Sequence, residues 1–238
     1  MKIPAPEVSE IVAGAGFDFV VIDTEHALLS VRDVYTMIVN YSSFGVLPLV
    51  RVTDHGYGDA QRYLDAGAAG IFVPHVSNGS VAEDVMSPLL FPPKGSRGMG
   101  FSSRAGKWGS LDGGRAEYLR YGDEDAVRVA MVEERESIDK IADILAAPGV
   151  DAIFVGAGDL AVSMGVPGGD SQVKNAVDHA INEAVKAGVP VGAGTRGAED
   201  ARKRREQGCS FIIAGNDAGM LVKASKATAS SMREGVSR

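Results

Sequence analysis

Short apolar runs alternate with longer amphipathic segments along the chain. The apolar runs, which we expect to be strands, cover residues 17–22, 46–52, 70–74, 127–132, 152–155, 189–193 and 211–214. Helical periodicity marks the segments between them, for example residues 30–41, 57–66, 137–146, 173–187 and 197–207. Because helices separate successive apolar strands, the pattern predicts an α/β fold with a parallel sheet.

Two architectures fit this alternation, a closed (βα)8 TIM barrel and an open doubly wound sheet. The chain has 238 residues, close to the ~250 residues typical of a TIM barrel. Polar residues follow several of the strands, whereas a doubly wound sheet gathers its ligands at one switch point. We therefore expect a single TIM-barrel domain over residues 1–238.

Two segments depart from a regular barrel pattern. Only residues 1–3 precede the helix expected at residues 6–15, so the first barrel strand is short or missing. Residues 91–120 are rich in Gly, Ser, Pro and Arg and are longer than an ordinary βα loop. We expect this segment to form a lid or an oligomer loop.

Charged residues stand where several strands end, and parallel strands end at the same edge of a sheet. They are Asp23, Glu25 and His26 after the first apolar run, Arg51 in the second, Glu133 after the fourth and Asp159 after the fifth. These side chains are therefore expected to converge.

Glu133 and Asp159 together predict a divalent-metal site. Carboxylate oxygens favour Mg²⁺ or Mn²⁺, with Co²⁺ as a further candidate, and no cluster of Cys and His has zinc-ligand spacing. The alternatives are structural: Asp159 as the N-cap of a helix starting at Leu160, and Glu133 as the start of a surface helix.

Arg51 and His26 are candidates for substrate binding and proton transfer. A guanidinium at a strand end can bind a carboxylate or an oxyanion, or else pair with Asp23 or Glu25. His26 follows two acidic residues that can fix its tautomer, or it is a strand-end histidine without a role. The sequence suggests no lysine at a strand end, so we expect metal rather than Schiff-base chemistry.

Residues 155–161 contain the pattern G-x-G-x-x-A after a strand. Dinucleotide sites share this pattern, but Asp159 inside the turn would repel a pyrophosphate. The glycines are better explained as bringing backbone amides close to a small anion.

Composition and charge argue against several kinds of binding partner and location. The net charge of -7 gives nucleic-acid binding no electrostatic support. The single cysteine, Cys209, excludes an intrachain disulfide and suits a reducing cytoplasm. No apolar run approaches ~20 residues and no signal-peptide pattern is present, so we expect no membrane association.

Six ordered motifs resemble the HpcH/HpaI family of metal-dependent aldolases. They are GFDFVVIDTEH, PLVRV, LDAGAAGIFVPHV, FPPKGSRGMG with the following SRAGKW, MVEERESIDKI and GVDAIFVGAGDLAVSMGVPG. The resemblance runs from about Pro4 to Gly219. It implies a (βα)8 barrel that assembles as a homohexamer, a trimer of dimers, through exchanged C-terminal helices, here residues 216–238.

The resemblance also implies an activity and a set of site residues. The family's metal-dependent aldolases cleave a 4-hydroxy-2-oxo acid to pyruvate and an aldehyde through a metal-stabilised enolate. Matched by position, Glu133 and Asp159 are the metal ligands and Arg51 is the pyruvate-binding arginine. His26 handles protons together with Asp23 and Asp65. The keto acid is held at Gly156, Ala157, Gly158 and Asp159, and Arg104 is supplied by a neighbouring subunit.

Two motif positions depart from the family pattern. Met131 replaces a glutamine that often precedes the metal-binding glutamate, and Gly156–Ala157–Gly158 replaces the usual Gly-Pro. Rival functions therefore stay open: an enolate-condensing enzyme like the siderophore-pathway citrate synthase or macrophomate synthase, a non-catalytic keto-acid-binding protein, and, more distantly, a dehydrogenase.

Overall fold

The computed structural model describes residues 1–55 and 57–236. Its sheet has seven parallel strands in sequential order from β1 to β7. They are β1 (Phe19–Asp23), β2 (Leu47–Arg51), β3 (Gly70–Val73), β4 (Val127–Val132), β5 (Ala152–Val155), β6 (Val191–Gly194) and β7 (Phe211–Ile213). The register sets Asp23 beside Arg51 and Val132 beside Val155, so the strand ends that carry charged residues are adjacent.

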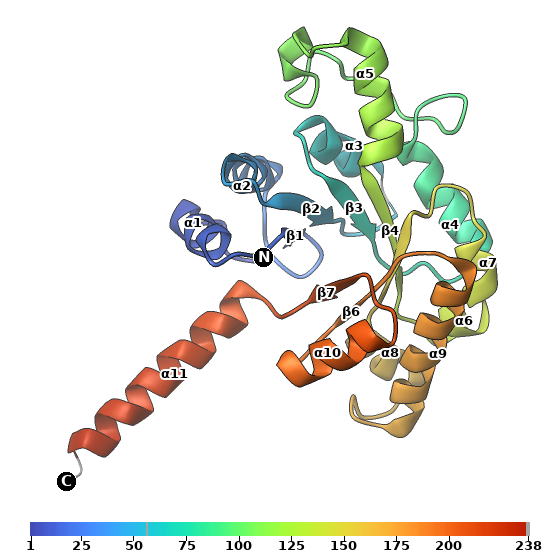
Figure 1. Cartoon of the computed structure of the whole chain (residues 1–238). Coiled ribbons are helices and arrows are strands. Elements are labelled where there is room, and N and C mark those ends of the chain that lie inside the picture. The colour runs from blue at the N-terminus through green and yellow to red at the C-terminus, as the bar shows by residue number, and fades with distance from the viewer. Residues whose placement is uncertain (56, 237–238) are drawn as a thin grey trace.

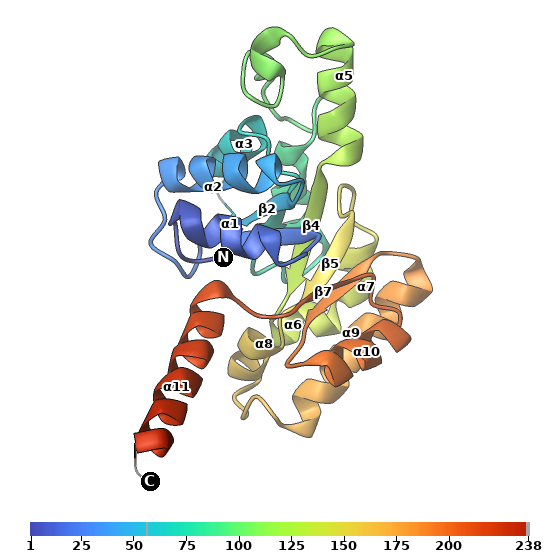
Figure 2. The same ribbon diagram turned by 60° about the vertical axis from the view of Figure 1, so that its left-hand side comes forward.

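Helices cover the outer face of the curled sheet (Figures 1 and 2). The α-helices are α1 (Pro6–Gly14), α2 (Val31–Ser43), α3 (Tyr57–Asp65), α4 (Gly79–Met86), α5 (Gly114–Arg120), α6 (Arg135–Asp139), α7 (Ile141–Leu145), α8 (Ala157–Met164), α9 (Ser171–Ala187), α10 (Ala198–Glu206) and α11 (Asp217–Val236). Short 3-10 helices occupy Ser87–Leu89 and Lys107–Gly109, and a π-helical turn occupies Tyr121–Asp125. None of the described helices is long and apolar enough to cross a membrane.

A small apolar cluster fills the concave side of the sheet. Its buried members are Leu49, Phe72, Val129, Met131, Ala152 and Phe154. Phe19 of β1 contacts Phe211 of β7 across this interior, with ring centroids 6.1 Å apart. The sheet therefore curls until side chains of its first and last strands meet against this cluster.

Residues 1–3 lie between β1 and the start of α11. The amino group of Met1 donates to the carbonyl of Val21, and the amide of Asp23 donates to the carbonyl of Met1 at 2.9 Å. The amides of Lys2 and Ile3 donate to the carboxylate of Asp217 at 2.8–3.0 Å. The predicted parallel α/β sheet is thus confirmed as a curled seven-stranded sheet, one strand short of a complete barrel.

Two helices differ from the sequence-based expectation. The helix expected at residues 137–146 is divided into α6 and α7, because Lys140 adopts non-helical angles of φ -110° and ψ 18°. α8 begins at Ala157, three residues before the expected Leu160, with Gly156 as its N-cap. Asp159 therefore lies in the first turn of α8 and is not its N-cap.

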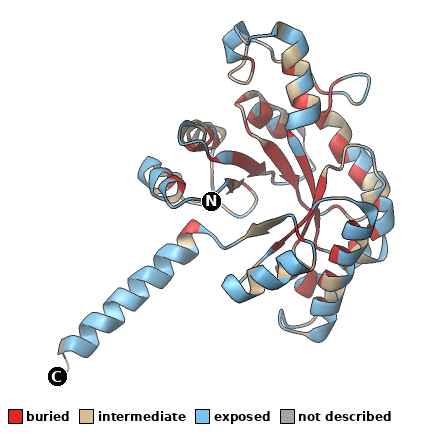
Figure 3. Ribbon diagram, viewed as in Figure 1, coloured by how far each residue is buried: buried red, intermediate tan, exposed pale blue. Residues whose placement is uncertain are grey.

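The segment 91–120 and helix α11 project from the sheet (Figure 1). Buried Arg97 anchors the first: its guanidinium binds Asp65 at 2.9 Å and stacks over Phe91 at 4.6 Å from the ring centroid. α11 is exposed along nearly its whole described length (Figure 3). Residues 237–238 of the expected C-terminal helix lie outside the described residues.

Candidate active site

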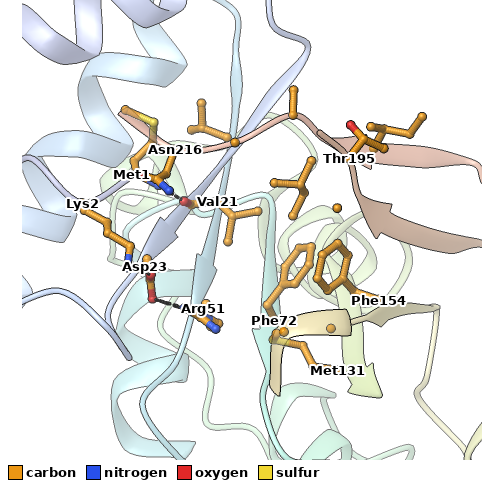
Figure 4. A pocket seen from close by; sticks show the side chains of 18 of the residues that line it. Met1, Lys2, Val21, Asp23, Arg51, Phe72, Met131, Phe154, Thr195 and Asn216 are labelled. Carbon is orange, nitrogen blue, oxygen red and sulfur yellow. Dashed lines mark hydrogen bonds and ion pairs between the residues drawn. The ribbon is translucent and has the colours of Figure 1, made fainter. Parts of the chain in front are cut away.

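A pocket of about 500 Å³ opens at the carboxyl ends of the strands. Phe72, Met131 and Phe154 form its apolar floor (Figure 4). Four of the predicted charged site residues line it, namely Asp23, Arg51, Glu133 and Asp159, together with residues 156–158. The parallel sheet explains this convergence, because neighbouring strands deliver their last residues to one edge.

Arg51 is held by two carboxylates. Its Nε and Nη2 bind Asp23 Oδ1 at 3.0 and 2.8 Å, and its Nη1 lies 2.8 Å from Glu25 Oε2. Each of the two terminal nitrogens keeps one further N–H. The ion pairing considered from the sequence is therefore present, and a donor from each nitrogen is still left for a ligand.

Three residues donate to the carboxylate of Asp23. Besides Arg51 it accepts the backbone amide of His26 at 3.1 Å and faces Lys2 Nζ at 3.2 Å (Figure 4). Burial alone would raise its pKa, but the bonds from Arg51, His26 and Lys2 outweigh burial and lower the pKa of Asp23 to about 2. Asp23 therefore stays ionised and holds Arg51 in place.

Glu133 is 1% exposed and only partly satisfied. Its Oε1 accepts the backbone amide of His75 at 3.0 Å, while its buried Oε2 has no hydrogen-bond partner among the described residues. Burial raises its pKa, and the charges of Asp159 and Glu25 raise it further. Glu133 follows β4 and precedes α6, so it does not begin a surface helix.

Gly156 leaves the carboxylate of Glu133 uncovered. A Cβ at this position would stand 2.7 Å from Glu133 Oε2 and 2.8 Å from its Cβ. From Gly156 the chain turns directly into α8, whose first amides have no acceptor within the helix. The amides of Ala157 and Gly158 and the side chain of Asp159 are therefore presented at the pocket.

These features fit a divalent cation. An orphaned, buried carboxylate oxygen beside a second carboxylate is an arrangement that a cation would stabilise, and both ligands are hard oxygen donors. Two protein ligands would leave coordination positions for a substrate. No group of three or more His, Cys, Asp or Glu side chains suited to a metal occurs in residues 1–55 and 57–236.

The two histidines near the site differ in their surroundings. The ring of His26 is half exposed, lies outside the lining of the pocket and comes no nearer than 4.0 Å to Glu25 Oε2. The ring of His75 bridges Glu25 and Glu134, with 3.0 Å to each carboxylate. His75 also has a φ of 56°, a strained conformation that directs its amide at Glu133.

Asp65 and Arg104 lie away from this pocket. Asp65 accepts bonds from Arg97 at 2.9 Å and Tyr118 at 2.8 Å, and Arg104 donates to the carbonyl of Ala66 at 2.8 Å. Both residues line a separate shallow hollow with Trp108. Within one chain, the structure does not bring them to Arg51 and Glu133.

Five polar pocket residues were not singled out from the sequence: Lys2, Thr195, Arg196, Asn216 and Asp217. Lys2 had no preceding strand to mark it as a strand-end residue. Thr195 and Asn216 follow the short strands β6 and β7, and their positions after strands are the signal that could have identified them.

A family model, curated relatives and a solved structure all match nearly the whole chain. The model of the HpcH/HpaI aldolase/citrate lyase family matches residues 3–224. The hydroxypyruvate/pyruvate aldolase of Pseudomonas aeruginosa is 31% identical over 97% of this chain and 85% of its own. The 4-hydroxy-2-oxo-heptane-1,7-dioate aldolase of Salmonella arizonae is 32% identical over 93% and 84%. The crystal structure of the citrate synthase SbnG has a TM-score of 0.89 at 31% identity, covering 100% of this chain and 92% of its own.

Proposed function

Because the chain belongs to the HpcH/HpaI aldolase/citrate lyase family, we propose that it is a divalent-metal-dependent aldolase. It cleaves a 4-hydroxy-2-oxo acid to pyruvate and an aldehyde, and it catalyses the reverse addition. One observation carries the proposal: Arg51, Glu133 and Asp159 line a single pocket, with an unpartnered oxygen on Glu133. The relatives named as pyruvate and hydroxypyruvate aldolases support the substrate class.

Arg51 and the start of α8 bind the keto-acid end of the substrate. The remaining N–H groups of Arg51 suit a carboxylate or a developing enolate oxygen. The amides of Ala157 and Gly158 suit the same negative charge. Asp23 keeps Arg51 oriented through the 2.8 and 3.0 Å contacts, so the guanidinium need not be ordered on binding.

Glu133 and Asp159 hold the cation, which we propose to be Mg²⁺ or Mn²⁺, with Co²⁺ as a third candidate. When bound, it supplies Lewis-acid polarisation of the keto group. His26 takes the proton of the 4-hydroxyl during cleavage and returns one during addition. The imidazole lies on the loop after β1, 4.0 Å from Glu25 Oε2.

Pyruvate methyl-proton exchange in heavy water tests this proposal without any knowledge of the aldehyde. In proton NMR, we expect the pyruvate methyl signal to disappear with Mn²⁺ or Mg²⁺ and to persist with EDTA. In Arg51→Ala the exchange rate should fall by about a hundredfold or more, as for other lost oxyanion donors. Near-normal exchange in that variant, or exchange in EDTA, would refute the assignment.

A second candidate is an enolate-condensing enzyme of the same family. The match to the citrate synthase SbnG favours it, because that structure covers the full length of this chain. Both candidates predict proton exchange, so product analysis separates them. Release of an aldehyde from 4-hydroxy-2-oxo acids identifies the aldolase.

The proposal extends to assembly and location. Residues 1–3 would take the place of the missing barrel strand beside β1. α11 would be exchanged between subunits of a homohexamer. Asp65 at the end of α3 and Arg104 of residues 91–120 would reach a neighbouring pocket. A buried free thiol at Cys209 suits a reducing cytoplasm.

A further inference from the structure

The pocket has a part that the proposed chemistry does not use. Arg51, Glu133 and Asp159 come from β2, β4 and the start of α8, whereas the loops after β6 and β7 line the remaining wall. Figure 4 shows Thr195 across the pocket from Arg51. If the keto-acid end binds at Arg51 and Glu133, the aldehyde-derived end of the substrate is left against this second wall. The inference therefore rests on the proposed aldolase function.

Only one cationic side chain of the pocket has no carboxylate partner in the described part of the chain. Lys2 is paired with Asp23, and Arg51 is paired with Asp23 and Glu25. Arg196 also lines the pocket, is exposed, and forms no ion pair with any described residue. An uncompensated guanidinium at a pocket wall is suited to a carboxylate, which it can bind through two parallel hydrogen bonds.

The backbone around Arg196 is fixed although its side chain is unpaired. The amide of Thr195 continues the β6–β7 ladder by donating to the carbonyl of Ile213 at 3.0 Å. The amide of Arg196 donates to Asp200 Oδ2 at 3.1 Å, at the start of α10. The guanidinium is therefore carried on an anchored loop, which limits where a bound carboxylate can lie.

Two neutral donors accompany Arg196. Asn216 accepts the amide of Gly219 at 2.8 Å through Oδ1, which leaves its NH₂ group as a donor. The hydroxyl of Thr195 has no hydrogen-bond partner among the described side chains and backbone. Both residues line the same wall of the pocket.

We propose that Arg196 is a specificity-determining residue that binds a carboxylate at the far end of the acceptor aldehyde, with Thr195 and Asn216 as supporting donors. The preferred acceptors are then aldehydes that carry their own carboxylate. Arg104 is the competing candidate for this role, but within one chain it donates to the carbonyl of Ala66 in a separate hollow.

Matched acceptor pairs test the assignment in the full-length, Mn²⁺-loaded protein. The pairs are glyoxylate against glycolaldehyde and succinic semialdehyde against butanal, each with pyruvate as donor. We expect Arg196→Gln to reduce the preference for the carboxylated aldehyde, expressed as a ratio of kcat/KM values, by about 10- to 100-fold, the range for losing a hydrogen bond to a charged group. Arg196→Lys should keep part of the preference.

Two further variants make the result decisive. Arg202→Gln removes an exposed arginine of α10 that lies outside this pocket, and it should leave the preference unchanged. An unchanged preference in Arg196→Gln would overturn the proposal, and its loss in Arg104→Gln alone would assign the carboxylate to residues 91–120. Absence of metal-dependent pyruvate exchange in the unmodified protein would instead refute the aldolase function itself.

Discussion

At the scale of single residues, Glu133 is the position where burial and charge oppose ionisation most directly. Its carboxylate is 1% exposed, and burial together with Asp159 and Glu25 raises its pKa. A bound divalent cation would favour the ionised form of Glu133 instead. We expect Glu133→Gln to weaken Mn²⁺ binding by at least about tenfold, because even outer-shell changes at metal sites cost this much. Calorimetric titration with Mn²⁺ measures the effect.

Asp139→Asn provides the control for that titration. Asp139 is an exposed carboxylate of α6 outside the pocket lining, so the variant changes the net charge equally. Its Mn²⁺ affinity should match that of the unmodified protein. Equal affinities in all three proteins would mean that Glu133 is not a ligand.

Asp23 makes the free energy of unfolding depend on pH in the acidic range. Its pKa is lowered to about 2 from 3.8, chiefly by Arg51 against the opposing effect of burial. A lowered folded-state pKa stabilises the protein above pH 3.8, by about 2 kcal/mol at neutral pH. This contribution is lost as pH falls from about 4 to 2, because the unfolded chain binds the proton first. Asp23→Asn should therefore lower the urea-unfolding free energy at pH 7 by about this amount or more.

The pH dependence separates this electrostatic role from packing. At pH 2.5, urea unfolding should show a smaller difference between Asp23→Asn and the unmodified protein than at pH 7. A difference that stays constant between the two pH values would argue that the variant acts through shape alone.

Substitution of His26 and of His75 should affect cleavage activity to different extents. If His26 transfers the substrate proton, His26→Gln should reduce cleavage of a 4-hydroxy-2-oxo acid by about 100-fold or more, the usual range for a general base. His75→Gln keeps the backbone amide that binds Glu133, so it should reduce cleavage less. Steady-state cleavage rates of both variants decide the matter, and the reverse order would transfer the proton role to His75.

At the scale of elements, the turn from β5 into α8 controls the metal ligands. Because a Cβ at Gly156 would meet Glu133 Oε2 at 2.7 Å, we expect Gly156→Ala to displace that carboxylate. Mn²⁺ affinity should fall by about tenfold or more, as for other disturbed metal-site supports. Gly158→Ala is the matched control, since a Cβ there meets no atom within 4 Å. Equal Mn²⁺ affinities in the two variants would contradict this account.

The strands were predictable to within a few residues, but some helix boundaries were not. Buried parallel strands are continuous apolar runs, so β4 and β5 were predicted with the bounds the structure gives them. The break between α6 and α7 at Lys140 has no glycine or proline to signal it. The early start of α8 was missed because Asp159 is a good N-cap residue by type, whereas the structure uses Gly156.

At the scale of the whole molecule, the sequence predicted which strand ends meet but not what surrounds them. Arg51, Glu133 and Asp159 could be grouped because sequential parallel strands share one edge. Lys2 reaches Asp23 only through a long-range contact between residues 1–3 and β1, which no local pattern encodes. Asp65 was paired with His26 by resemblance, yet it binds Arg97 and Tyr118, and its proposed role depends on assembly.

Helix α11 is the element that we propose to mediate assembly. Met220, Leu221, Val222 and Met232 are 41–67% exposed on a helix that extends away from the sheet (Figure 1). Most of the stability of a protein helix comes from packing its apolar side chains, so we expect a partner surface to bury these residues. If the proposed hexamer forms, deletion of residues 223–238 should reduce it from six chains of 24.8 kDa to smaller species in light scattering.

The deletion also tests whether the site depends on assembly. It retains Asp217 and Met220, which line the pocket, so the local geometry around Arg51 is preserved. If Asp65 and Arg104 act on a neighbouring pocket, the smaller species should lose cleavage activity while still binding Mn²⁺ through Glu133 and Asp159. Lys226→Gln within the same helix should keep both the hexamer and the activity. A fully active monomer would show that one chain contains every residue the reaction requires.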